Sequence, residues 1–177
     1  MGLNSDQLLL INDSPLDADG GVDLLIQAIA MLRVDCPQVL CALSGSGALL
    51  LPLQRLCRWL DVEAHVRFIA GHELDGYAAQ GCAYVTASRS EAMMRQQLQW
   101  ANTHGLPFIA LRQPFFSADA YAMLRWNKIN ACSDHADPES LALLLQSCCC
   151  VWLQQPHDQQ ALQQQAQDYF SLQGVGG

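Results

Sequence analysis

The sequence predicts an α/β fold built on a doubly wound parallel sheet, and three observations support it. Short apolar runs typical of buried strands alternate with longer segments in which apolar residues recur at helical spacing. This alternation repeats about five times along the chain. Glycine, proline and aspartate gather in the segments between. Since consecutive parallel strands need a right-handed crossover helix, the pattern favours a sheet covered on both faces.

Composition indicates one globular domain and excludes several kinds of partner. Apolar residues make up 51% of the 177 residues and charged residues only 15%, which is typical of a packed domain. The net charge is −8, with 9 basic residues, so free nucleic acid and anionic membranes are not expected partners. No run is long enough for a membrane span or signal peptide. We therefore expect a cytoplasmic protein.

The first half of the chain contains three strand–helix units. The predicted strands are 7–13, 38–45 and 65–71, and the predicted helices are 22–32, 53–60 and a short 73–80. Pro52 suits the first turn of the second helix, where its missing N–H costs little. Each strand is short and almost wholly apolar, as expected for strands buried on both faces.

The second half continues the alternation and then weakens. The segment 82–88 reads as a strand, 91–104 as a helix and 108–111 as a strand, with Gly105 as a left-handed helix C-cap. The segment 115–126 is a weaker helix prediction and 127–133 a weaker strand.

A clear helix follows at 137–153. Asp137 can cap it and Pro138 suits its first position. The tail then has apolar residues on one helical side and glutamines elsewhere, which predicts a C-terminal amphipathic helix; the apolar residues are Leu162, Ala166, Tyr169 and Phe170. We expect a Rossmann-like domain over 1–154 and a helix with a tail over 155–177.

Ligands of doubly wound sheets bind at the carboxyl ends of the strands. Here those ends are the acidic segment 12–21, the turn 44–47 with Gly45, Ser46 and Gly47, and the segments 70–73, 87–91 and 111–114. The glycine-rich turn either cradles a phosphate or is a plain tight turn, because such turns commonly follow strands.

No metal, cofactor or catalytic group is predicted. The eight cysteines include no Cys-x-x-Cys, and Cys148, Cys149 and Cys150 point in different directions on a helix. They are expected to be small buried hydrophobes. The histidines share no metal spacing, and no serine lies in a Gly-x-Ser-x-Gly setting.

Four segments, in order, resemble one glycosyltransferase family. They are "GGVDLLIQAIAML", "QVLCALSGSGALLLPLQRLCRWLDVEAHVRFIAG", "CAYVTASRSEAMMRQQLQWANTHGLPFIA" and "DPESLA", and the resemblance covers about residues 7–150. The order resembles the C-terminal, nucleotide-sugar-binding half of retaining GT-B glycosyltransferases, a family that includes bacterial enzymes of lipopolysaccharide and capsule synthesis. The resemblance implies a nucleotide-diphosphate sugar as ligand and polysaccharide biosynthesis as the setting.

The family's signature is present only in part. It has two glutamates eight positions apart, the first near the donor sugar and the second on the ribose; here Glu91 and Gln99 stand at these positions. Ala92, Met93 and Met94 replace a flexible glycine-containing loop, where side chains restrict backbone approach.

The family's two diphosphate-binding cations are also missing. The lysine position is Gly20, and the arginine position falls in the base-free "NDSP" segment. The loop is acidic instead, because it contains Asp13, Asp17 and Asp19. Each charged contact with a diphosphate that is lost or reversed should weaken binding by about 1 kcal/mol, even in a water-like dielectric. Arg89, Arg95 and Arg112 are the remaining candidate cations, of which Arg89 is the one we place nearest to the ligand.

Two functions remain open from the sequence. In the first, the chain is a glycosyltransferase-like domain that binds a nucleotide-diphosphate sugar through Glu91, Gln99, Arg89 and the 45–47 turn. In the second, it is a non-catalytic pseudo-glycosyltransferase module that binds a protein. In neither case do we expect the chain alone to transfer sugar, because a GT-B enzyme also needs an acceptor-binding N-terminal half.

Overall fold

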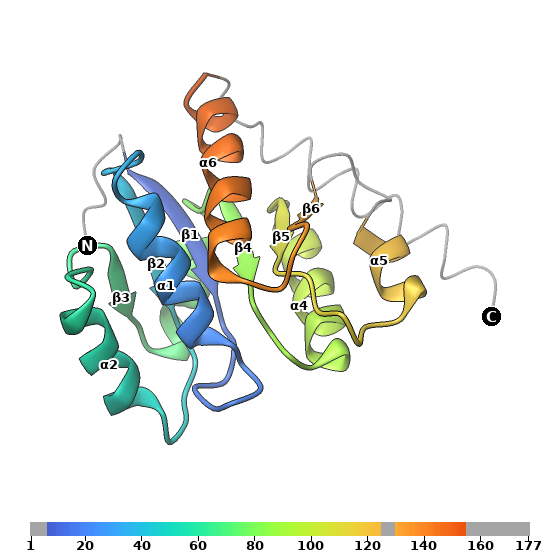
Figure 1. Cartoon of the computed structure of the whole chain (residues 1–177), viewed down its shortest axis with the longest axis horizontal. Coiled ribbons are helices and arrows are strands. Elements are labelled where there is room, and N and C mark those ends of the chain that lie inside the picture. The colour runs from blue at the N-terminus through green and yellow to red at the C-terminus, as the bar shows by residue number, and fades with distance from the viewer. Residues whose placement is uncertain (1–6, 125–129, 155–177) are drawn as a thin grey trace.

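The computed structural model describes residues 7–124 and 130–154. The predicted helix in the tail, and the domain boundary at 154, lie at or outside the limit of these residues. Within them, the predicted α/β class is confirmed: the strands form one parallel sheet in the order β3-β2-β1-β4-β5-β6 (Figure 1).

The strands are short and mostly buried. They are β1 (Leu8–Asn12), β2 (Val39–Leu43), β3 (Val66–Phe68), β4 (Ala83–Thr86), β5 (Phe108–Ala110) and β6 (Ala131–Cys132). All five neighbouring pairs are parallel. Strands β1, β2, β4 and β5 are buried along their whole length, which accounts for their unbroken apolar runs.

The helices connect these strands in turn. They are α1 (Val22–Leu32), α2 (Leu50–Trp59), α3 (Leu74–Ala78), α4 (Glu91–Thr103), α5 (Ala118–Leu124) and α6 (Pro138–Gln154), with a 3₁₀ turn, η1 (Gly71–Glu73), before α3. The expected caps are confirmed at three places. Pro52 lies in the first turn of α2, Gly105 has φ +66, and the Asp137 carboxylate accepts the Ser140 N–H at 2.8 Å.

Two apolar cores lie on opposite faces of the sheet. One contains Leu25 and Ile29 of α1, Leu53 of α2 and Leu145 of α6. The other contains Leu98 of α4, with residues of α3 and α5. Side chains of adjacent strand positions alternate between these cores, as the strand period requires. Figure 1 shows α1 and α6 side by side in front of the sheet.

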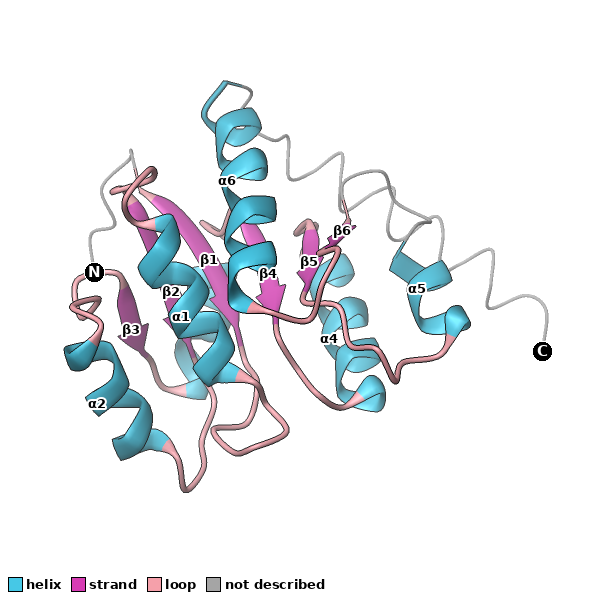
Figure 2. Ribbon diagram, in the orientation of Figure 1, coloured by secondary structure: helices cyan, strands magenta, loops and turns pink. Residues whose placement is uncertain are grey.

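The region predicted most weakly is also the least regular. The predicted helix over 115–126 begins only at Ala118, and of the described part of the predicted strand, 130–133, only Ala131–Cys132 is a strand. At the other end of the sheet, β3 is an edge strand. Figure 2 shows the loops after β1, β2 and β4 meeting at the edge to which the strand arrowheads point. This edge includes the topological switch point, where β1 and β4 are neighbours and the strand order reverses; we call this place the β1–β4 crossover. A doubly wound sheet binds its ligand there.

Candidate functional site

The loops after β1 and β2 are interlocked through glycines. A Cβ on Gly45 would lie 1.8 Å from the Ser14 carbonyl oxygen, and one on Gly20 would lie 1.9 Å from the Pro15 carbonyl oxygen. Gly47 is similarly close to the backbone of Leu16, whose N–H donates to the Ser46 carbonyl at 3.0 Å. In this structure the 45–47 turn packs against the loop after β1, so Gly45 and Gly47 are needed for the contact between the two loops, while Gly20 allows the loop after β1 to pack on its own Pro15.

The loop after β4 contacts segment 13–21 on the side away from the 45–47 turn. Gly21 has φ +65, and a Cβ there would lie 2.0 Å from the Ala87 carbonyl oxygen. The Arg89 N–H donates to the Asp19 carbonyl at 2.7 Å. Segment 13–21 is therefore enclosed between the loops after β2 and β4.

A buried polar network lies directly beneath this segment, at the β1–β4 crossover. The Gln97 amide donates to Ser14 Oγ at 2.9 Å and accepts from Thr86 Oγ1 at 2.8 Å. The Asn12 amide donates to Ser14 Oγ and to the Val85 carbonyl. Since buried polar groups are costly without partners, this mutual pairing explains why polar residues are tolerated between two apolar cores.

Tyr84 and Asp13 connect the network to the loop. The Tyr84 hydroxyl donates to the Asp13 carboxylate. Burial, and secondarily the Asp13 charge, raise the pKa of Tyr84 well above its ordinary value, so the phenol stays protonated and donates. Because the Tyr84 hydroxyl is a neutral donor, its bond to Asp13 adds no positive charge at the carboxyl edge of the sheet.

Glu91 begins α4, as the sequence predicts, and its carboxylate is fully occupied. It accepts from the Ser117 N–H at 2.8 Å, from Ser117 Oγ at 2.9 Å and from Arg95 at 2.7 Å. The Ser117 backbone bond, followed by the side-chain bonds from Arg95 and Ser117, lowers the pKa of Glu91 to about 2. In this arrangement Glu91 ties the start of α4 to the start of α5.

The arginines at this edge are matched by carboxylates or carbonyls. Arg89 donates to Asp23 through both terminal nitrogens, at 3.2 and 3.3 Å, and to the Ala18 carbonyl. Arg95 is paired with Glu91. Both cations therefore have compensating partners, while Asp17 and Asp19 remain exposed on the loop. The excess charge at this edge is negative.

The structure does not bring Gln99 to the same place as Glu91. Gln99 is exposed on α4, whereas Gln97, two residues earlier, is 4% exposed and faces the crossover. Helical geometry explains the difference, because two residues turn a side chain by about 200°. Sequence reasoning overlooked Gln97; the available signal was its position three residues after Met94, on the buried face of α4.

Arg112 lies elsewhere on the carboxyl edge, after β5. Its guanidinium carbon is 5.1 Å from the centre of the Tyr121 ring. It borders a pocket of about 760 Å³ formed by the ends of β5 and β6 and by α5, including Phe116, Cys132 and Ser133. Within the described residues Arg112 forms no ion pair.

The described side chains include no metal site, and the described cysteines are free thiols: Cys36, Cys41, Cys57, Cys82, Cys132, Cys148 and Cys149. No group of three potential ligand side chains among residues 7–124 and 130–154 is arranged to bind a metal. Cys41 is fully buried, and burial raises its pKa to about 12, so it is a protonated thiol. The described helices also include none long and apolar enough to cross a membrane.

Solved glycosyltransferases share this fold. The pneumococcal O-GlcNAc transferase GtfA, solved with UDP and GlcNAc, is 22% identical, matches 93% of this chain and 33% of its own, and has a TM-score of 0.67. WaaG, a glycosyltransferase of lipopolysaccharide biosynthesis, is 22% identical over 94% of this chain and 43% of its own, with a TM-score of 0.70.

The length of the match differs among these proteins. The catalytic domain of the cholesterol-α-glucosyltransferase from Helicobacter pylori is 15% identical over 92% of this chain and 99% of its own, with a TM-score of 0.65. Against GtfA and WaaG, the chain spans only a third to under a half of the solved protein. Neither a protein-family model nor a curated protein sequence matches it. The fold is therefore that of one half of a GT-B glycosyltransferase, as the sequence predicted.

Proposed function

We propose that this chain is a glycosyltransferase-like domain that keeps the frame of a nucleotide-sugar site but does not transfer sugar by itself. The observation that carries this proposal is electrostatic. The carboxyl edge at the β1–β4 crossover has Arg89 paired with Asp23 and Arg95 paired with Glu91, beside an acidic loop. A diphosphate needs unpaired cations or free N–H donors at that place.

The packing of the loop supports the same proposal. A lysine at position 20 would require a Cβ only 1.9 Å from the Pro15 carbonyl oxygen. The loop conformation seen here therefore excludes the cation that the resemblance places before Gly21. Binding through Glu91 and Gln99 would require Glu91 to release Arg95 and Ser117, and Gln99 to act from an exposed helix face.

The UDP present in the solved GtfA gives specific support for retained, weak donor binding. We propose a cytoplasmic domain in polysaccharide biosynthesis whose acceptor half is supplied by another segment or chain. Calorimetric titration with uridine- and guanosine-diphosphate sugars tests it. We expect dissociation constants near or above 1 mM, which corresponds to about −4 kcal/mol or weaker, and no sugar transfer.

A charge-reversing variant sharpens the test. Asp19 has an exposed side chain, so Asp19→Lys adds a cation to the loop without disturbing its packing. We expect donor affinity to rise by about tenfold, because two units of charge change near the phosphates. Asp35→Lys, also exposed but following α1 at the opposite edge, is the matched control and should change nothing. Micromolar binding by the natural chain that Gln99→Ala abolishes would contradict the electrostatic argument.

A second candidate function is protein binding by a domain without catalytic activity. The observation that favours it is the outer face of α2, where Trp59 is 82% exposed and Leu51 is 63% exposed. Absence of any heat with millimolar nucleotide sugar, for the natural chain and for Asp19→Lys alike, would remove the donor-site function and leave this one.

A further inference from the structure

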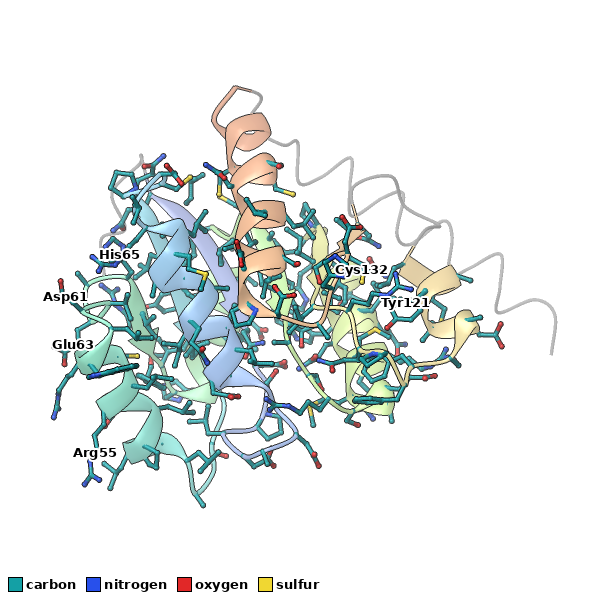
Figure 3. All side chains as sticks on the ribbon, viewed as in Figure 1. Arg55, Asp61, Glu63, His65, Tyr121 and Cys132 are labelled. Carbon is teal, nitrogen blue, oxygen red and sulfur yellow. The ribbon has the colours of Figure 1, made fainter. Side chains whose placement is uncertain are left out.

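The pocket beyond β5 is lined by aromatic and polar side chains. Its volume of about 760 Å³ lies within the range of about 300–1,000 Å³ that is usual for small-molecule sites. The ends of β5 and β6 and helix α5 enclose it, and its lining includes Phe116, Tyr121 and Cys132. Figure 3 shows Tyr121 of α5 and Cys132 of β6 close to one another. The pocket therefore uses other side chains than those at the β1–β4 crossover.

Arg112 is held at this pocket by contacts that leave its charge uncompensated. Its backbone N–H donates to Ser133 Oγ at 2.9 Å, and its guanidinium carbon is 5.1 Å from the centre of the Tyr121 ring. The face of the ring attracts the cation and so orients it without neutralising it. Among the described residues, no carboxylate forms an ion pair with Arg112. The guanidinium is exposed and can donate two parallel bonds to a ligand oxyanion.

Asn130, on the wall of the same pocket, is a second donor that lacks an acceptor. Its Oδ1 atom accepts the Phe108 N–H at 2.9 Å, which fixes the orientation of the amide. Its nitrogen is buried, and no group in the described part of the chain accepts a hydrogen bond from it. The Ser133 hydroxyl, by contrast, donates to the His135 carbonyl at 2.7 Å. Because both unsatisfied groups are donors, the pocket is suited to a ligand with acceptor oxygens.

The charges around the pocket favour an anion with a single charge. Burial raises the pKa of Cys132 to about 11; the positive charge of Arg112 lowers this pKa, and Asp134 raises it to a lesser extent. Arg112 therefore outweighs Asp134 at the position of Cys132. However, Asp134 also borders the pocket, and its carboxylate would repel a second negative charge on the ligand. One arginine beside one carboxylate fits a carboxylate ligand better than a phosphate dianion.

We propose that the pocket beyond β5 binds a small organic carboxylate, with Arg112 as the residue that binds the carboxylate group. Both terminal nitrogens of Arg112 donate to the ligand, and the apolar side of the ligand packs on Phe116. The size of the pocket suits a molecule such as a sugar acid. This proposal goes beyond the nucleotide-sugar site and does not rest on it.

An amide NMR titration of the full chain with D-glucuronate tests the proposal. A ligand of this size should bind with a dissociation constant of about 1 mM, and the shift changes should cluster at Arg112, Tyr121 and Ser133. D-glucose is the matched neutral ligand, since it has the same ring but no carboxylate. Inorganic phosphate, in slightly alkaline buffer, is the dianion. Both should bind at least about tenfold more weakly than glucuronate.

Variants of the charged residues identify the contact. Arg112→Ala should weaken glucuronate binding at least about tenfold, and Arg112→Lys should have an intermediate effect because lysine lacks the two-point geometry. Arg55→Ala is the matched control: Arg55 is an exposed arginine on α2, on the opposite side of the molecule from Tyr121 (Figure 3). It should bind like the natural chain. Asp134→Asn should strengthen the binding of phosphate more than that of glucuronate, because it removes the repelling charge.

Several results would overturn the proposal. One is the absence of saturable shifts near Arg112 at glucuronate concentrations well above the expected dissociation constant. Equal binding of glucose and glucuronate, or unchanged binding by Arg112→Ala, would show that the arginine does not select a carboxylate. Tighter binding of phosphate than of glucuronate would assign the pocket to a phosphate ligand instead. Nucleotide sugars are expected to shift the amides of segment 13–21, so failure of either proposal leaves the other intact.

Discussion

Two regions of the sheet's carboxyl edge, the centre between β1 and β4 and the end beyond β5, are built differently. At the β1–β4 crossover, three loops interlock through backbone contacts, and Arg89 and Arg95 are both ion-paired. Beyond β5, Arg112 is paired with no carboxylate among the described residues and lies beside a pocket of about 760 Å³. The pocket and the arginine without an ion pair therefore lie beyond β5, whereas a doubly wound sheet is expected to bind its ligand between β1 and β4.

The comparison also shows that the packing of the loops at the crossover does not depend on cations that could bind a diphosphate. Interlocking depends on backbone groups and on glycines, so it does not require the cations that bind a diphosphate. The side chains at the crossover satisfy one another within the chain. They therefore contribute to stability, and their effects should appear in unfolding measurements.

The largest effect should come from Gly45→Ala. The new Cβ would lie 1.8 Å from the Ser14 carbonyl oxygen, so one of the two loops must move. We expect the free energy of unfolding to fall by about 3 kcal/mol, measured by urea denaturation. Gly76→Ala is the matched control: a Cβ there meets nothing within 4 Å, and alanine in a helix is favoured by up to about 1 kcal/mol. Equal effects of the two variants would show that the loops are not interlocked.

Removal of the buried amide should have the next largest effect. Gln97→Leu removes the acceptor of the buried Thr86 hydroxyl and one of the two amide donors to Ser14 Oγ, which keeps its bond from Asn12. We expect a loss of about 2 kcal/mol, since each unsatisfied buried group costs about 1–3 kcal/mol. Gln99→Leu changes the same residue type on the exposed side of α4 and should alter stability by under about 0.5 kcal/mol. The reverse ranking would mean that Gln99, not Gln97, faces the crossover.

The central region of the edge and the region beyond β5 can be compared directly through their arginines, Arg89 and Arg112. Arg89→Ala removes a two-point pair with Asp23 and a bond to the Ala18 carbonyl, and it should cost about 1 kcal/mol. Arg112→Ala removes only a contact with the Tyr121 ring, worth about 0.5 kcal/mol at an exposed site. Raised salt should reduce the first loss more than the second. If salt reduced the stability loss of Arg89→Ala and of Arg112→Ala equally, Arg89 would not be distinguished from Arg112 by its ion pair.

Sequence reasoning predicted the fold because the fold depends on local patterns. The burial of β1 follows from its apolar run, and the caps at Gly105 and Asp137 follow from residue type and position. The Glu91–Arg95 pair has a local signature, because its i,i+4 spacing places both residues on one side of α4. The long-range contacts have none: Arg89 and Asp23 are 66 residues apart, and Glu91 and Ser117 are 26 apart, so only the folded chain shows that these residues pair.

Gln97 illustrates the same limit at closer range. The sequence offered several glutamines on α4, and the resemblance pointed to Gln99. Which amide enters the crossover depends on the rotation of α4 against the sheet, which the buried positions of Met94 and Leu98 fix. That rotation is determined by the packing of the helix on the sheet, and the spacing of residues within a motif does not predict it.

The smallest effect concerns Glu91 and depends on pH. Its pKa, about 2 in the folded chain against an ordinary value of 4.5, is lowered first by the Ser117 N–H and then by Arg95 and the Ser117 hydroxyl. A lowered pKa means that the carboxylate stabilises the fold above pH 4.5 and that this contribution disappears as the pH falls towards 2. The difference in melting temperature between the natural chain and Glu91→Gln should therefore be constant above that window and shrink within it. Comparison with Glu139→Gln, an acid in the first turn of α6, corrects for the general effect of removing one charge. A difference that does not change with pH would show that Glu91 is free, and hence available to a ligand at the crossover.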